Sequence, residues 1–196
     1  MNLKKIFLIL LFFYLQNSNS FSIEPDIFVQ STVNRASTVL SKNISKIEKI
    51  NELKVIAKET VDIEGIGFYT LGNYRKDMNE EELSKYAILF EQYFLKSFSS
   101  RLAEYTNPEI SVNSKKVLSE NYAIVNSVLK STKDRPEVNI DWRIYTKNPN
   151  NPYIRDLIIE GLSLARTQKE EFASIINSND GDFKVLFKTL EEFIKN

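Results

Sequence analysis

The chain has 196 residues, 42% of them hydrophobic, so it can form the core of one ordinary domain without disulfides or metal. Lys plus Arg and Asp plus Glu each number 26, and this zero balance argues against a surface built to bind nucleic acid. The sequence contains no His and no Cys, which excludes a Ser-His-Asp triad, a Cys nucleophile, a zinc finger and an iron-sulfur cluster.

Residues 1–20 have the pattern of a secretory signal peptide. Lys4 and Lys5 precede an unbroken apolar run from Ile6 to Leu15, and the small residue Ser20 fits a cleavage site. The run would span roughly 15 Å of helix, about half of a ~30 Å hydrocarbon core, so a stable transmembrane anchor is the poorer interpretation. We expect cleavage after Ser20 or two residues later. Loss of the two lysines would leave the mature protein a net charge of −2.

Three helices are predicted in the first third of the mature chain. Ser22 can cap the first, which has Pro25 in its early turn, and the second follows the polar segment 41–43. The third covers residues 61–72 and ends at Gly72, because glycine readily takes the left-handed conformation of a helix end. Apolar residues recur at helical spacing in the first two helices: Val29, Val33, Ala36 and Leu40, then Ile47, Ile50, Leu53 and Ile56.

A long helix is predicted to begin after Asn79. Asn79 as N-cap and Glu82 three residues later form a capping box, and Met78 with Leu83 form a hydrophobic staple. We expect the helix to continue until residues 107–108, Asn-Pro, stop it. Its apolar stripe consists of Leu83, Ala87, Phe90, Phe94, Phe98, Leu102 and Tyr105.

From Pro108 the hydrophobic period changes from helical to two residues, which is typical of strands. Four strands are predicted, around residues 110–112, 122–129, 138–145 and 154–160, with turn residues between them. The helical period returns after Ser163, a plausible N-cap, and a break at 177–181 separates two final helices. Consecutive strands with short connections indicate an antiparallel meander. Residues 21–196 are therefore predicted to form a single α+β domain, with helices packed on a four-stranded antiparallel sheet.

Two patterns superficially suggest chemistry. Asp156 and Glu160 lie near the end of the last strand and could act as a general acid and base, but such acids more often cap turns or pair with Arg. The segment Gly65-Ile66-Gly67 resembles a phosphate loop only superficially, because no strand precedes it and its spacing is wrong. The sequence gives no support for nucleophilic catalysis either.

The aromatic and aliphatic stripes leave two alternatives open. They can pack against one another as a solid core, or they can stand apart and enclose an apolar cavity. Periodicity does not separate these alternatives, because the wall of a cavity and the wall of a core have the same pattern.

Particular residues are similar to those of a known family. The segments Leu71–Tyr74, Phe90–Phe94, Ile154–Leu164 and Phe172–Ile176 resemble the MlaC family of periplasmic phospholipid-binding proteins, also called the toluene-tolerance auxiliary family. The similarity extends from about residue 45 to residue 193. It departs from the family pattern at residues 168–169, where Gln-Lys replaces an aromatic-Arg pair, and around residues 152–153, where a Trp is usual.

The resemblance implies helices around a twisted four-stranded antiparallel sheet, which enclose a deep apolar pocket for the acyl tails of a phospholipid. It also implies a soluble periplasmic carrier, not an enzyme, that shuttles lipid between the outer and inner membranes and maintains outer-membrane lipid asymmetry. The implied partners are an inner-membrane ABC transporter complex and an outer-membrane complex of a lipoprotein with a porin. No cofactor is expected beyond the phospholipid cargo. The protein is not expected to bind nucleic acid.

Within this interpretation we expect ten side chains to contact the tails. They are Ile66, Phe68, Phe90, Phe94, Val125, Leu129, Ile140, Trp142, Ile158 and Leu164. The strand positions depend on which face of each strand lines the pocket, and a phase error of one residue would exchange the whole set. Asp156, Glu160, Gly161 and Ser163 are expected to be structural and to fix the turn from strand to helix.

Two other functions compete with lipid transport. One is an exported small-molecule enzyme, which would need converging polar groups in its pocket and is disfavoured by the absence of His. The other is an envelope adaptor protein with a solid core and no ligand.

Overall fold

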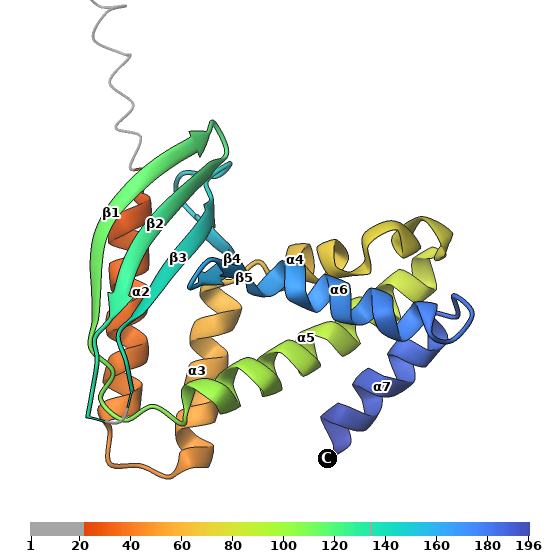
Figure 1. Cartoon of the computed structure of the whole chain (residues 1–196), viewed down its shortest axis with the longest axis horizontal. Helices are drawn as coiled ribbons and strands as arrows, with labels where there is room; N and C mark the ends of the chain where they lie inside the picture. Colours follow the sequence, from red (N-terminus) through yellow and green to blue (C-terminus); the bar gives the residue numbers. More distant parts are fainter. Residues whose placement is uncertain (1–21, 134) are drawn as a thin grey trace, which may run out of the picture.

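A computed structural model of the chain describes residues 22–133 and 135–196 (Figure 1). The predicted signal peptide lies outside these residues. Within them, six α-helices, a 3-10 segment and one five-stranded sheet follow in the order helices, sheet, helices. The elements are α2 (Pro25–Ser41), α3 (Lys46–Thr60), α4 (Ile63–Leu71), η2 (Gly72–Asp77), α5 (Glu80–Leu102), β1 (Ile110–Ser119), β2 (Tyr122–Leu129), β3 (Val138–Tyr145), β4 (Tyr153–Ile159), β5 (Leu162–Ser163), α6 (Leu164–Asn177) and α7 (Lys184–Lys195).

The predicted α+β class is confirmed, but the sheet has five strands where four were expected. All neighbours are antiparallel and follow chain order from β1 to β5. The extra strand exists because Glu160 and Gly161 have φ of +49° and +83°, as a two-residue hairpin turn requires. Leu162 and Ser163 therefore return along β4 before α6 begins.

The helices form two groups around the sheet (Figure 1). Helix α2 runs along the sheet and contacts β1 and β2, and α3 connects it to the second group. In the second group α4 contacts both α5 and α6, α7 packs on α5, and α6 contacts β4. Among the described residues, no helix combines the length and the apolar character that crossing a bilayer requires.

Helix starts follow the local sequence with one exception. The capping box of Asn79 and Glu82 is present, and a second joins Ser45 and Glu48 at the start of α3. The prediction that Ser22 caps the first helix is wrong, because α2 begins at Pro25 with Glu24 in the N-cap position. Proline at the first helical position needs no partner for its missing N–H, so the helix starts there without a side-chain cap.

The long helix is shorter than its stripe predicted. Helix α5 ends at Leu102, five residues before Asn107, which has φ of +49°. Leu102 and Tyr105 pack with Val39 and Leu53 in a small cluster between α2 and α3, and this contact turns the chain away from the helix axis.

The register of the sheet is irregular at three places, two in β1 and one in β4. In β1 the register with β2 shifts after Val112 and again after Val117, and Lys115 in between forms ion pairs with Glu24 and Asp26 at the start of α2. In β4, Asp156 pairs with Arg143 and Ile154 with Ile144, so Arg155 has no register partner. This extra residue is a β-bulge, and it reverses which residues of β4 face the core.

The bulge residue ties the sheet to α4. Arg155 donates from Nε to Oδ2 of Asp62 at 2.6 Å and from Nη1 to the Tyr122 hydroxyl at 2.7 Å. The other carboxylate oxygen of Asp62 accepts from the Gly65 N–H at 2.9 Å and so caps α4. The Asp62 N–H donates to the carbonyl of Ile154 at 3.0 Å. These bonds fix the start of α4 against the centre of β4.

Candidate functional site

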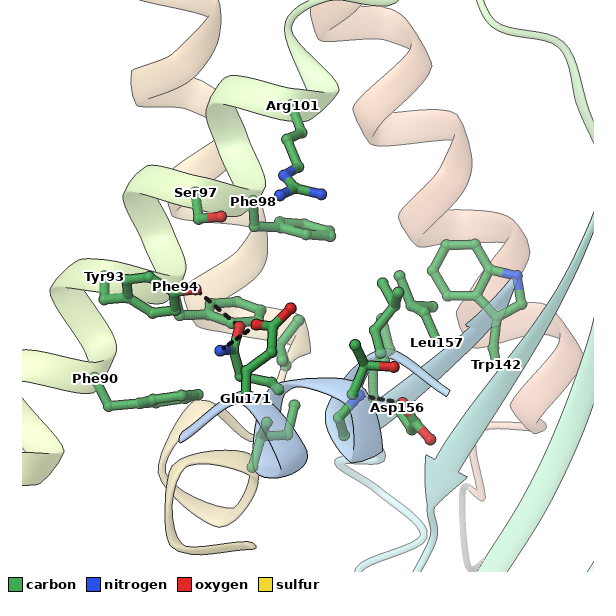
Figure 2. A pocket seen from close by; sticks show the side chains of 17 residues that line it. Phe90, Tyr93, Phe94, Ser97, Phe98, Arg101, Trp142, Asp156, Leu157 and Glu171 are labelled. Atoms are coloured by element: carbon green, nitrogen blue, oxygen red, sulfur yellow. Dashed lines mark hydrogen bonds between the residues drawn. The ribbon is translucent and has the colours of Figure 1, made fainter. Parts of the chain in front are cut away.

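A pocket of about 210 Å³ lies between α5, α6 and the face of the sheet that β3 and β4 present (Figure 2). Its lining is mainly apolar, with polar side chains of α5 and α6 toward one end and Asp156 beside the sheet. The lining residues are Val61, Ile66, Phe90, Tyr93, Phe94, Ser97, Phe98, Arg101, Trp142, Ile154, Asp156, Leu157, Leu164, Ala165, Thr167, Gln168 and Glu171.

Helix α5 supplies an aromatic wall. Phe90, Phe94 and Phe98 are four residues apart and therefore lie on one side of the helix. Their rings stack in series, with centroids 6.1 Å apart for the first pair and 5.3 Å for the second. Helix α4 approaches this wall closely at Gly67, where a Cβ atom would lie 2.7 Å from Cδ1 of Phe90. The absence of a side chain at Gly67 thus sets the position of the Phe90 ring.

The sheet supplies the opposite wall. Trp142 of β3 and Leu157 of β4 are register partners and both line the pocket. The Trp142 indole N–H donates to the Ser127 hydroxyl at 2.8 Å, so its polar atom is satisfied within the sheet. Because the bulge at Arg155 shifts the phase of β4, Leu157 occupies the pocket face that the alternation predicted for Ile158.

Asp156 closes the junction between β4 and α6 and is almost fully buried. Its carboxylate accepts from the Ser163 hydroxyl at 2.6 Å and from the Ala165 N–H at 3.0 Å, while Arg143 Nη1 lies 3.7 Å away. Ser163 in turn caps α6 by accepting from the Arg166 N–H. The structural role expected for Asp156 and Ser163 is thereby confirmed.

Glu160 does not join Asp156 in an acid-base pair. It occupies the hairpin turn and accepts from the backbone N–H of Asn139. The phosphate-loop pattern is likewise absent, since Gly65 and Gly67 are both inside α4. The sequence has no His or Cys, so Asp and Glu are the side chains considered as metal ligands. Among residues 22–133 and 135–196, no group of three or more of them is arranged to hold a metal ion.

The polar end of the pocket is built from facing side chains of α5 and α6. The Tyr93 hydroxyl donates to Oε1 of Gln168 at 2.8 Å, and the Gln168 amide donates to Oε2 of Glu171 at 3.0 Å. Burial raises the pKa of Tyr93, and the negative charge of Glu171 raises it further, so the phenol stays a proton donor. Ser97 and Arg101, one helical turn apart on α5, complete this end (Figure 2).

The structure brings five of the ten predicted contact residues together in the pocket wall. They are Ile66, Phe90, Phe94, Trp142 and Leu164. The other five lie elsewhere. Val125 and Ile140 are buried in the main core, Leu129 packs against it, and Ile158 pairs with Ser163 of β5. Phe68 is half-buried, and the Arg75 guanidinium lies 4.5 Å above its ring.

Several lining residues were not predicted. Phe98 continues the stripe of Phe90 and Phe94 at the same spacing, so the sequence held a signal for it. Gln168 and Glu171 follow Leu164 at helical steps, but polar residues on α6 do not by themselves indicate a pocket. Their position becomes informative only once α6 is known to face α5.

The comparisons with known proteins agree with this architecture. A model of the family described as MlaC protein matches residues 30–192. The intermembrane phospholipid transport system binding protein MlaC of Haemophilus influenzae is 24% identical over 192 residues, which cover 92% of this chain and 89% of that protein. The structure of the phospholipid-binding protein from Ralstonia solanacearum, in complex with a phospholipid, superposes with a TM-score of 0.74 at 18% identity, covering 88% of this chain and 98% of that one. The last comparison shows a shared fold.

Proposed function

Because the chain belongs to the MlaC family, we propose that it binds a phospholipid and transports it between membranes. The acyl tails occupy the pocket between α5, α6 and the sheet, and the head group remains near the polar end. Both related proteins are named for phospholipid binding or transport, which supports the same ligand class here.

The observation that supports this function most directly is the composition of the pocket wall. Rings from α5 face Trp142 and Leu157 of the sheet across a space with little polar lining other than at one end. The deepest acidic group of the pocket, Asp156, is engaged in capping α6 and is not available as a general acid or base. The proposal is therefore of a binding protein and not of an enzyme.

The energetics of lipid transfer explain why such a protein is needed. Moving a lipid with roughly thirty methylenes through water costs on the order of 20 kcal/mol, at about 0.8 kcal/mol per methylene. A pocket as apolar as the bilayer makes the transfer nearly neutral. The direction of transport then has to come from partners, for which we propose the inner-membrane ABC transporter complex and the outer-membrane lipoprotein-porin complex that the family resemblance implies.

A periplasmic carrier has to be exported and its signal peptide removed. Residues 1–20 act as a cleaved signal peptide, and residues 21–196 form the periplasmic carrier. Shuttling phospholipid between the two membranes would maintain the lipid asymmetry of the outer membrane.

An envelope adaptor with a solid core is the competing function. The pocket argues against it, because tightly packed interiors leave few voids larger than a water molecule.

Trp142 provides a direct test, because it is the single tryptophan of the sequence and lines the pocket. Mature protein exposed to vesicles of phospholipid with brominated acyl chains should show quenched tryptophan fluorescence, whereas vesicles of unbrominated lipid should not quench it. Organic extraction of protein purified from its native envelope should yield bound phospholipid by mass spectrometry. Unquenched fluorescence together with an empty extract would contradict the proposal.

A charged substitution on the aromatic wall separates the pocket from the rest of the surface. Phe94→Asp should abolish lipid loading, because it places a carboxylate among acyl chains. The matched control is Ile88→Asp on the same helix, where the side chain is 60% exposed and does not line the pocket. A folded Phe94→Asp variant that still loads lipid would remove Phe94 from the tail-binding wall.

A further inference from the structure

The polar end of the pocket holds one positive and one negative side chain that face the same space. Arg101 extends from the last turn of α5 and Glu171 from the middle of α6. Figure 2 shows the guanidinium of Arg101 and the carboxylate of Glu171 both pointing toward the part of the wall that Phe98 occupies. The two charges therefore flank one stretch of the pocket.

Exposure identifies this end as the opening. Arg101 and Glu171 are both exposed, while Phe90, Trp142 and Ile154 at the apolar end are buried. A ligand with its hydrocarbon among the buried residues would thus leave its polar group between Arg101 and Glu171.

Neither charge is neutralised within the protein. Within the part of the chain that the structure describes, Arg101 forms no ion pair and no side-chain hydrogen bond, and Glu171 is bonded only by the neutral amide of Gln168. The chain Tyr93–Gln168–Glu171 holds the carboxylate in place from the buried side, which leaves its outer oxygen available. Two other charged groups of α5 are engaged elsewhere: Lys96 donates to carbonyls of α7, and Glu91 pairs with Lys58.

We propose that Arg101 and Glu171 recognise the head group of the bound lipid and give preference to phospholipids with a cationic amine. The inference rests on the proposed lipid-binding function. The guanidinium binds the phosphate, for which its planar donors are suited, and the carboxylate binds the ammonium group. A lipid with an anionic, amine-free head group gains only the first contact and places its phosphate near an unpaired carboxylate, which disfavours it.

Competition between two lipids with identical acyl chains tests the proposal. Mature protein is exposed to vesicles of equal parts phosphatidylethanolamine and phosphatidylglycerol, and the bound lipids are quantified by mass spectrometry. We expect the ethanolamine lipid to be enriched about 1.5-fold to fivefold, the range that one exposed ion pair supports. Higher ionic strength should reduce the enrichment, because salt screens charges at the opening.

The variants assign the two roles separately. Glu171→Gln should bring the ratio of bound lipids close to one, because capture of the ethanolamine lipid falls more than capture of the glycerol lipid. Arg101→Gln should lower total loading and reduce capture of the glycerol lipid more than that of the ethanolamine lipid. The matched controls are Glu170→Gln and Arg166→Gln, exposed residues of α6 outside the pocket lining, which should retain the wild-type ratio.

The outcomes distinguish this inference from the function beneath it. A wild-type protein that takes up both lipids equally, or a Glu171→Gln variant that keeps the wild-type preference, overturns head-group recognition and leaves lipid binding intact. A protein that takes up neither lipid overturns the proposed function itself.

Discussion

At the scale of single residues, the pocket depends on polar groups that are satisfied inside the fold. The Trp142 indole bonds to Ser127, Asp62 links Arg155 to the start of α4, and Asp156 joins the end of β4 to α6. Each of these bonds lets a polar atom be buried next to an apolar cavity without a large desolvation cost. The walls can therefore be mainly apolar although the strands and helices around them contain charged residues.

Asp156 should be the most sensitive of these groups, because it is 4% exposed and accepts two hydrogen bonds. Replacing it with Ala would leave the Ala165 N–H, the Ser163 hydroxyl and Arg143 without their acceptor. We expect Asp156→Ala to lower the free energy of unfolding by about 3 kcal/mol, measured by urea denaturation. Asp77→Ala, at an exposed position of η2, should change it by less than about 0.5 kcal/mol. A loss below about 1 kcal/mol for Asp156→Ala would show that the junction is held by packing alone.

At the scale of elements, the pocket is defined by how closely α4 approaches α5. Gly67 is buried against Phe90, and the two helices cannot come this close with a side chain between them. The Phe90 ring also makes an edge contact with Phe172 of α6, with centroids 6.3 Å apart. A shift of the Phe90 ring would therefore displace both α4, through Gly67, and α6, through Phe172.

A double-mutant cycle tests this contact. Gly67→Ala should lower the free energy of unfolding by roughly 1–3 kcal/mol, because overpacking outweighs the better helix propensity of alanine. In a Phe90→Leu background the same substitution should cost at least about 1 kcal/mol less, since the smaller side chain leaves room for the new methyl group. Urea unfolding of the four proteins gives the coupling energy. Equal costs in the two backgrounds would mean that Gly67 is required for a different reason.

The elements also show what sequence alone could and could not establish. Helix starts at Asn79 and Ser163 and the meander of long strands were predictable, because caps and alternating patterns are local signals. The end of α5 at Leu102 was not, since contacts with α2 and α3 decide it. The bulge at Arg155 was not predictable either, because Arg155 bonds to Asp62, which is distant in the sequence.

For the site, the same distinction holds. The stripe of Phe90 and Phe94 was visible as a helical period, and both residues line the pocket. Ile158 was predicted for the wall with the phase of its strand left open, and the structure places Leu157 there, in the register that follows the bulge. The sequence does not indicate that Arg101 and Glu171 lie at the same end of the pocket, because only the packing of α5 beside α6 brings them there.

At the scale of the whole molecule, the pocket is small for its proposed cargo. Its volume of about 210 Å³ lies below the roughly 300–1,000 Å³ of pockets that enclose drug-sized ligands, and a two-tailed lipid is larger than those. The walls must therefore separate when lipid enters. Helix α6 contacts α4, α7 and β4, and α5 contacts α3, α4 and α7, so each helix is held mainly by elements other than its partner across the pocket. Separation of α6 from α5 is therefore the expected direction.

Spin labels can measure this separation, because a sequence without cysteine accepts labels only where cysteines are introduced. The pair Gln92→Cys and Glu170→Cys places labels at exposed positions of α5 and α6. Lipid loading should lengthen their mean distance by on the order of 4 Å, the contact distance that a hydrocarbon chain between two walls must clear. The reference pair Glu81→Cys and Gln92→Cys, both on α5, should not change. An unchanged distance between α5 and α6 in the loaded protein would place the expansion elsewhere.

The irregular pairing of β1 affects whether copies of the protein can associate through this strand. As the outermost strand it presents unpaired backbone groups, onto which another polypeptide could add as a further strand. Its two register shifts bend this edge, and Lys116 places a positive charge beside it. Both features oppose the flat, neutral template that fibril growth requires. These features disfavour the addition of a further strand at this border of the sheet.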